Sequence, residues 1–351
     1  IEVRERSPQQ WFTWINNTGT EETTRLRLGL GYQHHNLFDR DQLLTATYTT
    51  SPEDTEQVGQ YGINYQIPLY SLTSTVSLFH VKSDIDTGRV ANAFDVQGSG
   101  TTTGARYGQV LNRYGSLRQR AYLEVIDKLF DNDIDFEGTN IGADVRSRPL
   151  GAAWQIEWGQ TGNNGLFNIG YNRNLGGGSF NDEISYAASR FGASPDWDAW
   201  RYTFNQDINL PGNWLLAYRL RGQHADEPLI SGEQLGLGGA SGPRGFEEWE
   251  AGVDRGASMR FQFWAPPVTG GFQFGVFLDH AFGKRIQALP GEPEDIDLTS
   301  TGVSAKWQWN NHLVSALDIG HVLEGFDDVP QLTQEGDNQV HFSLVYRFQG
   351  D

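Results

Sequence analysis

The sequence contains no cysteine and only one methionine among its 351 residues. Without cysteine the chain has no disulfide framework, no thiol nucleophile and no thiolate metal site. A helical soluble domain would also carry more leucine, methionine, alanine and lysine. Glycine instead reaches 42 residues and aromatic residues 13%. These shortages argue against a helical soluble protein and exclude cysteine chemistry.

Long apolar runs are missing as well. No stretch of about 18 apolar residues occurs, so the sequence contains no candidate transmembrane helix. The mean hydropathy of −0.51 is still compatible with a membrane barrel, because only every second wall residue must be apolar. Positive charge is also scarce. The net charge of −18 argues against sequence-independent nucleic-acid binding.

Apolar and polar residues alternate with period two along most of the chain. At the C-terminal end, for example, Val340, Phe342, Leu344, Tyr346 and Phe348 alternate with mostly polar residues. Such alternation predicts strands with one apolar face. The segments run about ten residues, the length of a tilted membrane strand, and aromatic residues gather near their ends, as in membrane girdles. Both features favour a membrane barrel over a soluble β-sandwich or propeller.

The alternation predicts seventeen candidate strands. They are 11–17, 23–34, 42–50, 58–67, 72–83, 99–112, 116–128, 139–147, 150–160, 164–174, 198–208, 213–224, 255–265, 271–281, 300–310, 313–321 and 338–348. Single-chain bacterial barrels have even strand numbers and place both termini on the periplasmic side. We therefore merge 139–147 and 150–160 across Pro149, a residue tolerated at strand starts and bulges.

The predicted fold is all-β, a 16-stranded antiparallel transmembrane β-barrel in which strand 11–17 closes against strand 338–348. Residues 1–10 are expected to be a periplasmic entry segment and residues 11–351 the barrel. Short connections then lie on the periplasmic side, as bacterial barrels have them. Long connections, including 175–197 and 225–254, lie outside the cell.

One loop carries an informative motif. A glycine-rich run, Gly238-Gly239-Ala240-Ser241, precedes Arg244-Gly245-Phe246, and Glu248 and Asp254-Arg255-Gly256 follow. This order resembles the lid loop of two-partner secretion transporters, the TpsB family of haemolysin and filamentous-haemagglutinin secretion-activation proteins. That family belongs to the outer-membrane assembly-factor superfamily. The chain departs from the family at Pro243, where a β-branched residue is usual, and proline fixes φ and removes a donor.

Two other segments agree with the resemblance. Residues 277–283, Phe-Leu-Asp-His-Ala-Phe-Gly, resemble the strand that receives the lid arginine. The last strand resembles the aromatic-ended signal read by the barrel assembly machinery, and its signal residues would be Phe342, Leu344, Tyr346 and Phe348. In the family that phenylalanine is usually terminal, whereas three residues follow Phe348 here.

The resemblance implies that loop 225–254 folds into the barrel and that its Arg244-Gly245-Phe246 tip is locked by Asp279 and Phe277. The alternation supports this. Phe277 and Asp279 face the lumen if the apolar residues of the same strand face outward, namely Phe272, Phe274, Val276 and Leu278. An enclosed guanidinium needs a carboxylate partner. Gly245 would let the tip turn tightly, and Phe246 is expected to pack on the barrel wall. The alternative is a solvated loop arginine, whose surface pairs contribute little.

The inward phase also collects arginines, so an acidic protein is predicted to have a basic interior. They are Arg25, Arg27, Arg118, Arg120, Arg201, Arg219, Arg221 and Arg260. Two explanations stay open. The arginines could hold an unfolded acidic or polar polypeptide weakly, or they could pair with lumen acids such as Glu124 and Asp207 to brace the wall.

Catalytic and metal-binding motifs are missing. The adjacent His34 and His35 point to opposite faces of a strand and cannot share a metal. No Gly-x-Ser-x-Gly nucleophile motif or P-loop is present. His341 and Ser343 share a face, but such neighbours lie about 7 Å apart, too far for a hydrogen bond. We predict no catalytic residue, metal site or cofactor, and no enzymatic activity.

The resemblance implies a pore in the outer membrane of a Gram-negative bacterium that exports a partner polypeptide, a large secreted exoprotein, from the periplasm to the cell surface. Outer-membrane lipid and lipopolysaccharide, and the barrel assembly machinery during biogenesis, are the other expected partners, whereas nucleic acid is not. The alternatives are an insertase that opens the seam between the first and last strands, and a passive porin. The family's periplasmic POTRA domains and plug helix are not matched in these residues. Ile1 is not an initiator methionine, so a mature or trimmed product is expected.

Overall fold

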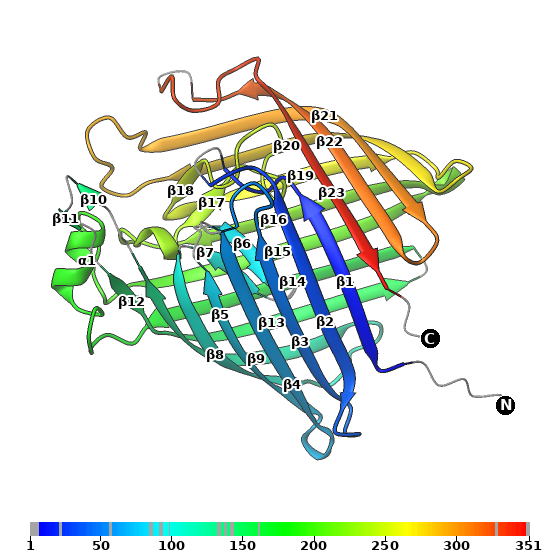
Figure 1. Cartoon of the computed structure of the whole chain (residues 1–351), viewed down its shortest axis with the longest axis horizontal. Coiled ribbons are helices and arrows are strands. Elements are labelled where there is room, and N and C mark those ends of the chain that lie inside the picture. The colour runs from blue at the N-terminus through cyan, green and yellow to red at the C-terminus, as the bar shows by residue number, and fades with distance from the viewer. Residues whose placement is uncertain are drawn as a thin grey trace.

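The computed structural model describes residues 7–20, 23–55, 58–83, 87–90, 94–97, 99–131, 135–136, 139–140, 144–160, 162–326 and 329–348. One closed antiparallel sheet forms a barrel in the described part of the chain (Figure 1). Its strands, in order around the wall, are β1 (Gln9–Asn16), β2 (Arg27–Leu37), β3 (Gln42–Thr50), β4 (Gly59–Leu69), β5 (Ser74–Ser83), β8 (Gly100–Val110), β9 (Arg118–Phe130), β12 (Val145–Ser147) with β13 (Pro149–Gln160), β14 (Asn163–Asn174), β15 (Asp198–Leu210), β16 (Trp214–His224), β19 (Arg255–Trp264), β20 (Phe272–Lys284), β21 (Asp295–Trp309), β22 (Leu313–Glu324) and β23 (Asn338–Arg347).

β12 and β13 are two parts of one wall strand. Both pair with β9 in the same register, with Val145 opposite Phe130 and Leu150 opposite Val125. The interruption is at Arg148, immediately before Pro149, which has no N–H to donate to the ladder. With this strand counted once the wall has sixteen strands, and the predicted fold class is confirmed.

The predicted strand 139–147 is only partly right. Of its residues, Val145–Ser147 join the wall, whereas β11 (Thr139–Asn140) pairs with β10 (Asp135–Phe136) in a small hairpin. Residues 141–143 lie outside the described residues. Two further hairpins lie outside the wall ladder, β6 (Thr87–Val90) with β7 (Phe94–Gln97), and β17 (Leu235–Leu237) with β18 (Ala251–Val253).

The first and last strands close the barrel as predicted. β1 and β23 pair over five residues, from Phe12 opposite Arg347 to Asn16 opposite Ser343. The Asn17 side chain then continues the ladder. Its Nδ2 donates to the Val340 carbonyl at 2.6 Å and its Oδ1 accepts from the Phe342 N–H at 2.8 Å. An amide side chain thereby takes the place of a backbone pair at the end of this short seam.

Both chain termini lie at one end of the barrel (Figure 1), which we call the turn end. Its connections are short and include the 3-10 turns η1 (Tyr70–Leu72) and η2 (Pro211–Asn213). The opposite loop end carries the long connections, with the helix α1 (Glu183–Ser189), capped by Asp182, and the 3-10 turn η3 (Ser231–Glu233). No helix in the described residues is long and apolar enough to cross a membrane.

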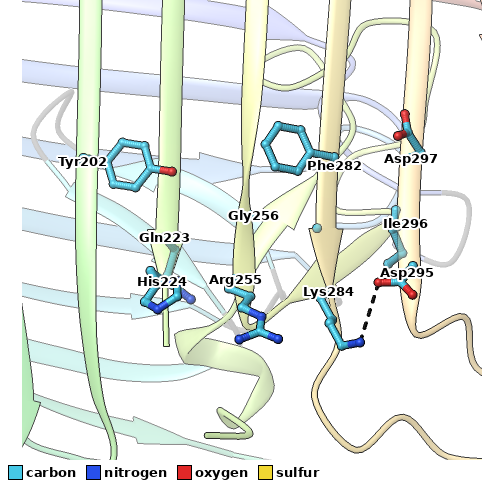
Figure 2. Close-up of a pocket in the computed structure, with 11 residues that line it drawn as sticks. Tyr202, Gln223, His224, Arg255, Gly256, Phe282, Lys284, Asp295, Ile296 and Asp297 are labelled. Atoms are coloured by element: carbon cyan, nitrogen blue, oxygen red, sulfur yellow. Dashed lines mark ion pairs between the residues drawn. The ribbon is translucent and has the colours of Figure 1, made fainter. Parts of the chain in front are cut away.

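The outer face at the loop end holds a hollow of about 490 Å³ across β15, β16, β19, β20 and β21. Figure 2 shows its lining, where the rings of Tyr202 and Phe282 lie above Arg255 in the view, and Lys284 forms an ion pair with Asp295 at 3.9 Å. Charged groups thus take the place of apolar ones at the last outward positions of these strands. This change explains why β20 and β21 extend several residues beyond their predicted limits, since an apolar outward face no longer marks these strand ends. At the start of β21 the apolar residues Ile296 and Leu298 are buried on the inward face instead.

Candidate functional site

The connection between β16 and β19 turns inward over much of its length. Of residues 225–254, most are buried, including Leu229, Leu237 and Phe246. The tip of this loop touches inward-facing side chains of five successive wall strands, from β19 to β23. A loop that were solvated outside the barrel would not reach these side chains.

Arg244 and Asp279 form the central contact. The guanidinium donates from Nε to Oδ2 at 2.7 Å and from Nη2 to Oδ1 at 2.8 Å, and the Arg244 backbone N–H adds a bond to Oδ2 at 3.1 Å. Arg244 is 2% exposed and Asp279 is fully buried. A two-pronged pair of this kind fixes orientation as well as charge. Removal of either partner would leave an uncompensated buried charge.

The remaining donors of Arg244 are also used. Nη1 donates to Gln262 Oε1 at 2.5 Å and to Asp318 Oδ1 at 3.1 Å, and the guanidinium carbon lies 3.6 Å above the centre of the Phe277 ring. Two carboxylates and an aromatic face therefore surround one cation. Gln262 and Asp318 were not singled out from the sequence. Both lie in the inward phase of their strands, which is the only sequence signal that could have indicated them.

Glycine residues make room for the tip. In the wall, a Cβ at Gly320 would lie 2.6 Å from the Gly245 nitrogen, and a Cβ at Gly302 would lie 2.5 Å from the Phe277 ring. Gly302 and Gly320 face each other in the β21–β22 register. In the loop, Gly245 has φ of +105°, which side chains strongly disfavour. The tip backbone therefore packs directly against the wall backbone at Gly320, and Gly302 makes room for the Phe277 ring.

The other tip contacts are a hydrogen bond and an apolar one. The Gly245 N–H donates to Nε2 of His341 at 3.3 Å. Because a backbone N–H can only donate, this ring nitrogen carries no proton and the imidazole is neutral in this arrangement. Phe246 is fully buried in a cluster that includes Leu237 and Val253 from the loop and Leu298 and Val322 from the wall. The tip residues Arg244, Gly245 and Phe246 therefore all contact inward-facing groups of the wall.

Of the eight arginines predicted to face the lumen, six have the following partners. Arg25 pairs with Glu247 at 2.6 Å and Arg201 with Glu233 at 2.8 Å, Arg221 donates to the Gly236 carbonyl, Arg260 donates to the Ala240 carbonyl, Arg219 pairs with Asp207 at 2.5 Å, and Arg27 donates to backbone carbonyls of residues 23, 24 and 26. Four of the six thus hold the loop, and one braces the wall.

The remaining predicted lumen residues are placed differently. Arg118 and Arg120 lie 3.9 and 3.8 Å from Glu157 and stay largely exposed. Glu124, a predicted partner of lumen arginines, pairs with Arg106 at 2.7 Å. The bracing explanation therefore has direct contacts behind it, and these contacts brace the loop as well as the wall. In the described residues, no group of three or more His, Cys, Asp or Glu is placed to hold a metal ion.

A pH dependence is expected from Glu248. Its Oε1 accepts the Ala240 N–H at 2.6 Å, and burial raises its pKa to about 7, against the opposing effects of that bond and of Arg221 and Arg260. A glutamate pKa raised above its usual value favours the packed loop at low pH, and this stabilisation is lost as pH rises through about 7. We expect current fluctuations in planar bilayers to increase between pH 5 and pH 8.

The matching variant is Glu248→Gln, which keeps an acceptor for Ala240 but cannot ionise. It should show a flatter pH profile than the unmodified protein over the same range. Glu250 has a raised pKa from the same cause, burial, so Glu250→Gln combined with Glu248→Gln should flatten the profile further. A profile as steep as that of the unmodified protein would show that other groups set the pH dependence.

Comparisons with known proteins identify a family and similar folds. The family model "Haemolysin secretion/activation protein ShlB/FhaC/HecB" matches residues 1–292. The fold is similar to CdiB from Escherichia coli (TM-score 0.71, 17% identity, 99% of this chain and 64% of that one) and to CdiB from Acinetobacter baumannii (0.70, 17%, 97% and 60%). It is also similar to BamA from Haemophilus ducreyi lacking POTRA domains 1-3 (0.65, 12%, 98% and 71%).

The chain spans less than two thirds of the length of either CdiB structure. No curated protein sequence matches it. The family model covers more than half of the chain and includes the Arg244-Gly245-Phe246 tip and Asp279. The chain therefore belongs to the ShlB/FhaC/HecB family of haemolysin secretion/activation proteins.

Proposed function

We propose that the chain forms an outer-membrane pore that exports a partner polypeptide, a large secreted exoprotein, from the periplasm to the cell surface. Membership of a family of secretion/activation proteins supports this direction of transport. The observation that carries it is the ion pair of Arg244 and Asp279, which fixes a loop inside the barrel by its tip. We call residues 225–254 the lid, and its release would widen the path.

The dimensions are compatible with an extended cargo. An extended chain is about 10 Å wide across its side chains, the spacing of packed sheets. Barrels of sixteen to eighteen strands can leave an aqueous channel when nothing fills them. No nucleotide-binding motif occurs in the sequence. Folding of the exoprotein outside the cell would then drive transport.

The proposal also covers the surroundings of the barrel. The turn end would face the periplasm, with residues 1–10 as the entry segment, and the loop end would face the outside. Outward apolar side chains such as Leu30, Phe274 and Val303 are exposed on the wall and would contact lipid and lipopolysaccharide. Phe342, Leu344, Tyr346 and Phe348 would be read by the barrel assembly machinery during biogenesis.

A second candidate is an insertase that opens the seam. The similarity in fold to BamA and the seam of five paired residues, against eight between β1 and β2, favour it. Because the chain has no cysteine of its own, Ile15→Cys and Leu344→Cys, which are register partners, can staple the seam with a single disulfide. A passive porin is the third candidate, and it gives the Arg244 tip no role.

The test is co-expression of the barrel with a candidate large exoprotein, chosen from the reading frames next to its gene, in a Gram-negative host that lacks such a system. We expect the exoprotein at the cell surface with the unmodified barrel and with the oxidised, stapled barrel, because cargo in a pore does not cross the seam. Ile15→Cys alone is the control. Loss of export on stapling would favour lateral opening, and absence of export from the unmodified barrel would contradict the pore.

A further inference from the structure

Asp254 closes the lid at its C-terminal end, immediately before β19. It is fully buried. Oδ1 accepts from Arg190 Nη1 at 2.5 Å, from the Leu229 N–H at 2.9 Å and from Gln234 Nε2 at 3.2 Å. Oδ2 accepts from Arg190 Nη2 at 2.8 Å and from the Ile286 N–H at 2.7 Å. One carboxylate therefore joins both ends of the lid to the loops 175–197 and 285–294.

Arg190 completes the same junction from the other side. Besides its two bonds to Asp254, it donates to the Leu229 carbonyl and, at 3.0 Å, to the Ile286 carbonyl. It follows directly after α1, whose residue Tyr186 packs with Trp197, Leu229 and Ile230 in one buried cluster. The start of the lid is therefore part of the packed structure at the loop end.

A second buried carboxylate holds the same part of the lid to the wall. Glu233 is fully buried and lies 2.9 Å from Lys128 Nζ on β9 and 2.8 Å from Arg201 Nη2 on β15. Burial alone would raise the pKa of Glu233, but these two cations outweigh it and hold that pKa below its usual value. Glu233 is therefore ionised between two cations near neutral pH.

Between this region and the tip the lid narrows to a neck of three residue pairs, β17 with β18. The middle pair is Gly236 opposite Gly252. The two glycines have no side chains of their own, and each has wide backbone freedom. The Trp249 ring lies over Gly236, and the Gln234 side chain lies against Gly252. Gly238 and Gly239 follow at once, both with positive φ. The neck is therefore the point at which the lid bends most easily.

We propose that the pair Asp254 and Arg190, with Glu233, anchors the base of the lid, so that opening is a swing of residues 237–251 about Gly236 and Gly252. This inference rests on the proposed lid function. Residues 225–234 and Asp254 stay in place while the tip leaves Asp279. Asp254 and Arg190 are positioning residues, because they hold the hinge in register with the receiving strand and do not line the path opened by the tip.

Pulsed electron paramagnetic resonance distances test this on purified protein without cargo. Asn112, at the turn end, would carry the reference label, and Ser231 at the base and Ser241 at the tip are exposed serines suited to the second label after replacement by cysteine. In Arg244→Glu we expect the distribution from Asn112 to Ser241 to broaden and that to Ser231 to remain narrow. Adding Asp254→Asn should broaden the second distribution as well.

The control is Arg255→Gln, which removes a charge from the next residue on the outer face (Figure 2) and should leave both distributions unchanged. If Asp254→Asn does not assemble, Arg190→Lys keeps the charge but loses the two-pronged geometry and should broaden the base distribution. Equal broadening of base and tip in Arg244→Glu alone, or a base unaffected by both anchor variants, would overturn the anchor. Failure of export would contradict the pore instead, because these distances need no cargo.

Discussion

Arg244→Glu is expected to release the lid while the barrel still assembles. In the unmodified protein Asp279 and Asp318 both form ion pairs with Arg244. The substitution removes this shared cation and adds a third carboxylate beside the two. Breaking a buried ion pair destabilises by about 3–5 kcal/mol, and like charges at this distance repel further. Single-channel recording should show higher and noisier conductance, and surface export of the partner should fall because the lid no longer closes in a defined position.

Arg219→Glu is the matched control for lumen charge. Arg219 also faces the lumen and pairs with Asp207 at 2.5 Å, but it does not touch the lid. The two variants change the interior charge equally, so a difference in conductance between them reports the lid rather than electrostatics. Equal conductance in both variants would contradict a lock at Arg244.

The exchanged pair, Arg244→Glu with Asp279→Arg, should recover only part of the closed state. The structure limits the recovery for two reasons. The backbone N–H of residue 244 also donates to Asp279. In addition, Gln262 and Asp318 accept hydrogen bonds from the Arg244 guanidinium. Arg260, 3.8 Å from Asp279, would face a second arginine. A coupling energy near zero in the double-mutant cycle would show that the two positions act independently.

The wall could be predicted because each strand carries its own signal. In β20 the alternation alone places Phe277 and Asp279 inward, and both are buried in the structure. The even strand number then decides the merger at Pro149, and the continuous register with β9 agrees. Strand ends were predicted less well where charge replaces apolar residues, as at Asp295 and Lys284.

The lid's surroundings could not be predicted in the same way. The alternation identifies the residues that face the lumen, but it does not say which of them a loop of thirty residues will contact. Asp318, Gln262 and His341 lie on three different strands and meet only through the folded tip. The junction of Arg190 and Asp254 joins residues 64 positions apart. The helix α1 has only seven residues and begins at the cap Asp182, within a segment that the sequence predicted as a loop.

The second large effect on assembly is expected from a substitution on the outward face of the last strand, β23. Leu344 faces outward, 37% exposed, beside its register partner Ile15. The girdle residues Tyr346 and Phe348 follow on the same face, two and four residues further along the strand. Arginine on the lipid face costs about 2–4 kcal/mol at the midplane and less toward the interface. We expect Leu344→Arg to impair assembly, measured as loss of the heat-modifiable band on electrophoresis and a lower unfolding midpoint in lipid vesicles.

Ser343→Arg supplies the comparison, because it adds the same side chain at the adjacent residue, in the inward phase opposite Asn16 and Ala316. The arginine at this position would reach the aqueous lumen, so the Ser343→Arg variant should assemble close to normally. A midpoint lowered equally by both variants would mean that any bulky charge disrupts the seam. A selective loss in Leu344→Arg would instead locate lipid on one face of β23, which separates membrane insertion of this strand from its pairing with β1.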